Sequence, residues 1–205
     1  MTLRYYVYIS DSKVDMLLPQ VDPGFAGKRS TELGINLKLV TGKHKRESDP
    51  DRIARLERVV RHIDDFCDVG TIDEPGQYFR GRLTMRMRQS EGLVYLTGAT
   101  EDTVVGLGGS NGHIIGGAAP KELPGFPRSL LPGMVEGLTA MAADDAPANA
   151  LELAHMANRN LRADQQEVEF IAKRLAHGPS PYPELDGGKA LTVLVGSPLF
   201  VALAE

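Results

Sequence analysis

Four arginines recur at alternate positions in residues 79–88, around Thr84, and the residues between them are apolar or glycine. They are Arg80, Arg82, Arg86 and Arg88. Because side chains alternate across a β-strand, this spacing predicts a strand with one face in the core and four arginines on the other. A guanidinium group donates two parallel hydrogen bonds to a phosphate or a carboxylate. The arginine face is therefore our first candidate site, with an anionic ligand.

An ordinary solvated sheet face is the alternative explanation for these arginines. Like charges that are adjacent on one face of a sheet repel each other, so the strand gains no stability from them. Acidic residues of the same chain would relieve that repulsion, and Glu91, Glu101 and Asp102 lie in the neighbouring predicted turns. Surface charges of this kind usually form weak pairs. If the arginines meet acids of the same chain, the ligand hypothesis weakens.

A glycine-rich segment, residues 104–117, follows the arginine strand and supplies the rest of the candidate site. We expect a hairpin at residues 106–112 that forms one rim of the binding face, with glycines at bulge and positive-φ positions. The binding candidates in it are Gly108, Gly109, Ser110 and His113. Gly106, Gly108 and Gly112 superficially match a dinucleotide loop, but the residues that follow are poor helix formers and no acidic residue follows at the required distance.

Ser110 and His113 also permit a different hypothesis, an enzyme of unknown reaction type that acts on a small anionic substrate. Nucleophilic catalysis requires a third, orienting group and donors for an oxyanion, and the sequence shows neither. The other four histidines are scattered singly, and Cys67 is the only cysteine. We therefore predict no metal site, no cofactor and no disulfide, and name no catalytic residue.

The elements that position these residues are predicted from hydrophobic spacing and turn signals. Strands are expected near residues 3–9, 35–40, 78–88, 93–97, 103–107 and 191–195. A long helix is expected near residues 50–67, because Asp49 is a good N-cap and Pro50 a good first helical residue. Short links between the middle strands favour antiparallel hairpins. The predicted fold class is α+β, with a central antiparallel sheet.

The second half of the chain is predicted to be helical. Residues 148–158 form one expected helix, and residues 164–177 form another, with Val168, Ile171 and Leu175 on one face. We expect one domain over residues 1–205, with a sheet-rich core over 1–118 and a helical region plus a C-terminal strand over 119–205. A run of eighteen apolar residues is absent from the sequence, so no membrane span is predicted.

Charge is distributed unevenly along the chain. Residues 28–88 carry a net charge of +4 and the remainder −8, which gives −4 for the 205 residues. The overall acidity argues against a general nucleic-acid binder, whereas the basic middle suits an anionic ligand or an acidic partner protein. The N-terminus reads as a strand and lacks the features of a signal peptide, so we predict a cytoplasmic protein.

Several stretches resemble an uncharacterised family of actinobacterial proteins. They are residues 5–20 (YYVYISDSKVDMLLPQ), 102–110 (DTVVGLGGS), 174–179 (RLAHGP) and 196–203 (GSPLFVAL). That family is similar to the N-terminal modules associated with bacterial caspase-and-TPR conflict systems. The resemblance implies a defence or signalling context and transfers no activity, ligand or catalytic residue. A structural subunit of a homo-oligomer is a third reading of the chain, beside the binding module and the enzyme.

Overall fold

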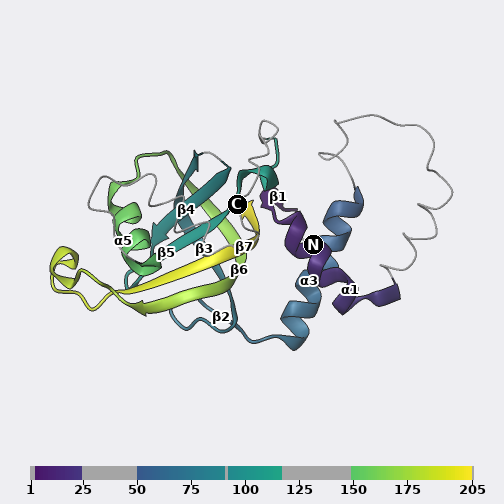
Figure 1. The fold of residues 1–205 in the computed structure, drawn as a ribbon, viewed down its shortest axis with the longest axis horizontal. Coiled ribbons are helices and arrows are strands. Elements are labelled where there is room, and N and C mark those ends of the chain that lie inside the picture. Colours follow the sequence, from purple (N-terminus) through teal and green to yellow (C-terminus); the bar gives the residue numbers. More distant parts are fainter. Residues whose placement is uncertain (1–2, 25–49, 91, 117–148, 205) are drawn as a thin grey trace. The chain divides into compact units, whose positions relative to one another are not determined.

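The computed structural model of the chain describes residues 3–24, 50–90, 92–116 and 149–204 (Figure 1). Two compact units make up the chain: Met1–Ile9 with Val69–Glu205, and Ser10–Asp68. The predicted single domain, and its division after residue 118, stay predictions, because compactness does not show which parts fold independently. The strand expected near residues 35–40 lies outside the described residues.

Five strands of the first unit close into a barrel. The strands are β3 (Tyr78–Ser90), β4 (Leu93–Ala99), β5 (Thr103–Ser110), β6 (Gln165–Pro179) and β7 (Thr192–Leu203). Around the ring, β3 pairs with β4, β4 with β5, β5 with β7, β7 with β6, and β6 with β3. The β5–β7 pair is parallel and the other four are antiparallel. Two short strands extend the ring, β1 (Tyr5–Ile9) beside β7 and β2 (Val69–Gly70) beside β3.

The path of the chain through the barrel is that of an OB-fold. Counted along the chain, the five strands follow the order 1-2-3-5-4 around the ring, with the third and fifth parallel. The helix α5 (Ala150–Asn160) lies between the third and fourth strands in the sequence. OB-folds are five-stranded Greek-key barrels. A shared strand order describes architecture and carries no function by itself.

The predicted fold class is therefore wrong. Instead of a central antiparallel sheet with a helical C-terminal half, the protein has a closed barrel whose last two strands come from that half. Residues predicted as a helix over 164–177 form the long strand β6. The strand expected at 191–195 continues to Leu203 as β7. The helix expected at 148–158 is present as α5.

Barrel closure explains why residues 165–179 form a strand. Val168, Phe170 and Ala172 alternate along β6 and are buried in the core. The 168–171–175 spacing that predicted a helix places Ile171 on the opposite side of the strand from Val168. Ile171 is also buried, so both sides of β6 carry apolar residues there and the pattern fits either period. Pairing with β3 on one edge and β7 on the other decides between them.

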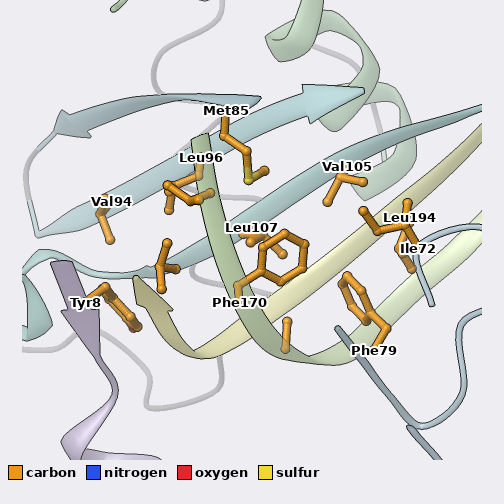
Figure 2. Packing of buried hydrophobic residues seen from close by; sticks show 13 residues of the cluster. Tyr8, Ile72, Phe79, Met85, Val94, Leu96, Val105, Leu107, Phe170 and Leu194 are labelled. Atoms are coloured by element: carbon orange, nitrogen blue, oxygen red, sulfur yellow. The ribbon is translucent and has the colours of Figure 1, made fainter. Parts of the chain in front are cut away.

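The barrel interior is filled by apolar side chains from all five strands and by Tyr8 of β1 (Figure 2). The rings of Phe79 and Phe170 meet edge to face, with centroids 5.8 Å apart. A five-stranded barrel is narrow, so glycines in the wall make room for these rings. A Cβ on Gly196 would lie 2.6 Å from the Phe79 ring, and one on Gly81 would lie 2.8 Å from the Phe170 ring.

Helix α5 covers part of the outer surface of the barrel beside β4 and β5 (Figure 1). Leu153 and Ala154 of the helix pack with Tyr95 and Val104 of those strands. The Asn149 side chain caps the helix by accepting hydrogen bonds from the amides of Leu151 and Glu152, at 3.0 and 3.1 Å. The cap and the buried face together hold α5 on the barrel.

The second unit contains two described helices, α1 (Asp11–Val21) and α3 (Pro50–Phe66). Arg52 of α3 donates two hydrogen bonds to the Asp11 carboxylate, at 2.8 and 3.0 Å. Arg58 pairs with Asp22 at 2.6 Å. The helix predicted at residues 50–67 corresponds to α3. Arg52 of this helix pairs with an acid of α1, and Arg58 pairs with Asp22, the residue that caps the C-terminus of α1.

Candidate functional site

Strand β3 presents the four arginines as their spacing predicts. Phe79 and Met85 are buried in the barrel, with Leu83 and Met87 packed against them, so the alternate side chains face outward. Three arginines of the outer face are exposed and one, Arg86, is half-buried. The outward row is Arg80, Arg82, Arg86 and Arg88. Since the neighbouring strands differ along this row, its two halves have different surroundings.

The first half of the row faces acidic residues of β6. Arg82 is opposite Glu169 and diagonal to Glu167, and its Nε lies 2.7 Å from the Glu167 carboxylate. The Arg82 hydrogen bond holds the pKa of the exposed Glu167 carboxyl below its usual range, and the same contact raises the pKa of Arg82. Glu169 also pairs with Arg4 at 2.5 Å. Arg82 is therefore paired with an acid of the same chain, which weakens the ligand hypothesis for this arginine.

The direct cross-strand neighbours of the second half of the row are uncharged, and the acid diagonal to Arg86 is Glu167, which pairs with Arg82. Arg86 is opposite Gln165 on β6 and Thr97 on β4, and Arg88 is opposite Tyr95. Arg86 donates a 3.1 Å hydrogen bond to the carbonyl of Leu161, the residue that caps the C-terminus of α5. Helix C-termini carry partial negative charge, so this contact favours the guanidinium. It also fixes Arg86 beside Arg88 without using a carboxylate.

The glycine-rich segment forms part of the barrel wall and not the expected hairpin. Gly108 and Gly109 are buried within β5. A Cβ on Gly109 would collide with the hydroxyl of Tyr8, so this glycine makes room for a core side chain. The strand ends in a single 3₁₀ turn, Asn111–His113, and the next described residues, 114–116, are not helical. The predicted role of these two glycines as ligand-facing residues stays a prediction.

Ser110 and His113 have structural contacts of their own. The Ser110 hydroxyl accepts a 3.3 Å hydrogen bond from the Gly112 amide and so caps the 3₁₀ turn. The His113 ring meets the edge of the Tyr8 ring, with centroids 5.9 Å apart. Their proposed part in binding or catalysis stays a prediction.

A different serine and histidine, which no sequence pattern indicated, lie together in the structure. His155 lies on α5, Ser180 directly follows β6, and Asp186 lies in the 3₁₀ turn Pro183–Asp186. Ser180 Oγ is 3.1 Å from His155 Nδ1, and Asp186 Oδ1 is 3.4 Å from His155 Nε2. The Tyr182 ring packs edge-on against the His155 ring at 5.5 Å. We call these three residues, Ser180, His155 and Asp186, the serine–histidine–aspartate cluster.

The described residues contain no group of three or more His, Cys, Asp or Glu side chains that could hold a metal ion. Within the same ranges, the helices are all too short or too polar to cross a membrane. The features that characterise the described part of the chain are the closed barrel, the outward arginine row and the serine–histidine–aspartate cluster.

The chain belongs to a family of unknown function, DUF7019, whose model matches residues 4–205. No curated protein and no solved structure matches it. Family membership brings no activity, ligand or partner with it. The resemblance to actinobacterial proteins and to the modules of caspase-and-TPR conflict systems stays a prediction.

Proposed function

We propose that this protein binds an anionic small molecule through Arg86 and Arg88, on the outer face of β3. The observation that carries the proposal is the absence of acidic residues among the direct cross-strand neighbours of these two arginines, in contrast to Arg82. Two guanidinium groups on one face repel each other, and an anion bound between them relieves that repulsion. A phosphate or a carboxylate accepts parallel hydrogen bonds from such groups.

The surroundings of Arg86 and Arg88 favour a small ligand over a nucleic acid. Binding of a single strand generally requires exposed aromatic rings for base stacking. The aromatic residues beside the row, Tyr78 and Tyr95, are both buried. Helix α5 covers part of the β4–β5 surface, and in OB-folds the corresponding second and third strands bind oligonucleotides. The surface available for a ligand is therefore a short basic stretch of β3 around Arg86 and Arg88.

A thermal-shift panel of nucleotides, sugar phosphates and dicarboxylates tests the proposal. A ligand at about a hundred times its dissociation constant stabilises the folded protein by about 2.7 kcal/mol. For a chain of this size that corresponds to a rise in Tm of roughly 5–10 °C. The double variant Arg86→Ala, Arg88→Ala should lose the shift. The matched control, Arg82→Ala, removes an arginine already paired with Glu167 and should keep it.

Two results would contradict the proposal. One is that no compound in the panel shifts the Tm, while native mass spectrometry of the freshly purified protein shows no retained small molecule. The other is an equal loss of the shift in Arg82→Ala and in the double variant. If the purified protein instead retains a second protein, and Arg86→Ala with Arg88→Ala releases it, an acidic partner replaces the small molecule. A defence or signalling context, which the sequence resemblance implies, is compatible with either ligand.

A further inference from the structure

The serine–histidine–aspartate cluster supports an inference that is independent of the arginine face. Its members come from three consecutive elements of the second half of the chain: α5, the end of β6, and the turn before β7. Packing of α5 on the barrel and the pairing of β6 with β7 hold them in place. A cluster on fixed elements keeps its geometry better than one on a long loop.

The contacts around His155 fit the tautomer in which Ser180 donates a hydrogen bond to the imidazole ring. The amide of Tyr182 donates to Ser180 Oγ at 3.3 Å, so the hydroxyl proton is available to His155 Nδ1, which lies 3.1 Å away. A neutral imidazole that accepts at Nδ1 carries its proton on Nε2. That nitrogen faces the Asp186 carboxylate at 3.4 Å. The order serine, histidine, carboxylate is that of a catalytic triad, with the two ring nitrogens exchanged.

The three side chains of the cluster differ in how much solvent reaches them. The side chains of His155 and Asp186 are only 1% and 3% exposed, whereas Ser180 is half-buried. Among the described residues, His155 Nε2 and Asp186 Oδ2 are buried without a hydrogen bond of good geometry. A buried carboxylate oxygen without a donor destabilises the fold. The same carboxylate would stabilise the imidazolium that forms when a histidine accepts a proton from a serine.

We infer that Ser180 is a nucleophile for acyl transfer, with His155 as its general base and Asp186 as the residue that positions the imidazole. The substrate class is a carboxylic ester. Ser180 Oγ attacks the carbonyl carbon, its proton passes to His155 Nδ1, and the alcohol leaves with that proton as its carbon–oxygen bond breaks. A water molecule then attacks the acyl group by the same proton path, which releases the acid and restores the hydroxyl. The 3.4 Å contact shortens as the reaction proceeds, as catalytic hydrogen bonds of ligand-free sites commonly do.

Labelling with an alkyl fluorophosphonate tests the inference directly. Ser180 Oγ would attack phosphorus, fluoride would leave, and the proton would pass to His155. Intact-mass measurement followed by peptide mapping should show one adduct, on Ser180. Ser180→Ala should show none. The rate of labelling of His155→Gln should be lower by a factor of at least about 100, because a general base contributes about 10²–10⁴ in rate.

The matched control is Ser12→Ala, which removes an exposed serine hydroxyl of helix α1. It should label at the rate of the unaltered chain. The inference is overturned by the absence of any adduct, by an adduct on a different serine, or by loss of labelling in Ser12→Ala. Since a buried His155 variant can misfold, circular dichroism accompanies each measurement, and Asp186→Asn serves as a second variant. Equal labelling of folded His155→Gln and the unaltered chain also refutes it.

Discussion

Individual ionisable residues of this protein fall into two groups according to how much water reaches them. Both side chains of the Arg82–Glu167 pair are exposed, so the pair contributes little to stability and its effect is a local lowering of the carboxyl pKa. Lys13 and Tyr95 are buried, and burial lowers the pKa of the first and raises the pKa of the second. Only the buried groups should make stability depend strongly on pH.

Lys13 gives a prediction about pH in the alkaline range. Burial lowers the pKa of its ammonium group from 10.5 to about 7. Between these values the unfolded chain binds a proton that the folded chain does not bind, so the free energy of unfolding rises with pH, by up to about 1.4 kcal/mol per unit. Lys13→Met should remove that slope. Urea unfolding at several values between pH 7.5 and 9.5 measures it.

The control for this measurement is Lys173→Met, because Lys173 is exposed on β6. That variant should keep the slope of the unaltered chain. If Lys13→Met leaves the slope unchanged, Lys13 remains charged in the folded state. Burial of its ammonium group and of its hydrogen bond to Ser10 Oγ is then too weak to lower the pKa.

Gly109 gives a second prediction, about packing inside the barrel. A methyl group at this position would collide with the Tyr8 hydroxyl, so Gly109→Ala should lower the free energy of unfolding by about 1–3 kcal/mol. Tyr8→Phe removes the nearest atom of that collision. The double variant should therefore lose less stability than the sum of the single variants, and a double-mutant cycle by urea unfolding measures the difference.

A glycine with room around it serves as the control for Gly109. A Cβ on Gly24 would lie 3.7 Å from the nearest atom, an ordinary contact, so Gly24→Ala should not be destabilising. Strict additivity of Tyr8→Phe and Gly109→Ala would show that the methyl group displaces something other than the Tyr8 hydroxyl.

At the residue scale, the sequence located the arginines but not their partners. An alternate spacing is a local property, so it identified the outward face of β3 without knowledge of any other strand. Pairing of Arg82 with Glu167 depends on the register between strands that are 85 residues apart in the chain. Ser180, His155 and Asp186 likewise meet only after α5 docks on the barrel, so a local spacing pattern does not identify them.

At the scale of single elements, hydrophobic spacing was reliable for most elements, including β4 and β5, which are buried along almost their whole length, and it failed at β6. Helix α3 and strand β3 each have one apolar side, and both lie where their patterns predict them. Strand β6 contains two Gln, two Glu and two Ala, which favour helices, and it carries apolar residues on both sides. Two flanking strands override that local preference.

Helix α5 gives the third prediction, because the Asn149 side chain satisfies two amides at its N-terminus. Asn149→Ala should lower the free energy of unfolding by about 1 kcal/mol, whereas Asn149→Asp, which can accept the same hydrogen bonds, should be nearly neutral. Thermal unfolding followed by circular dichroism compares the two. An unchanged stability of Asn149→Ala would mean that packing of Leu153 and Ala154 alone defines the start of the helix.

At the scale of the whole molecule, the barrel is held together by its last strand. Strand β7 pairs with β6 along residues 192–203, with β5 along 192–196, and with β1 along 200–203. The first and last described strands of the chain are therefore neighbours. Such distant pairings cost loop-closure entropy before they are rewarded, so folding should be slow, in the range of milliseconds to seconds.

Removal of β7 gives the fourth prediction. A chain that ends at Leu191 lacks seven buried apolar residues: Val193, Leu194, Val195, Leu199, Phe200, Val201 and Ala202. Truncation of one large core side chain alone costs about 2–5 kcal/mol, against a total stability of about 5–15 kcal/mol for a typical protein. The shortened chain should therefore lose cooperative thermal unfolding and the spread of amide proton chemical shifts. A chain that ends at Ala204 keeps every β7 pair and should retain both. Cooperative unfolding of the chain that ends at Leu191 would contradict this prediction. It would show that β3, β4, β5 and β6 form a stable open sheet without β7.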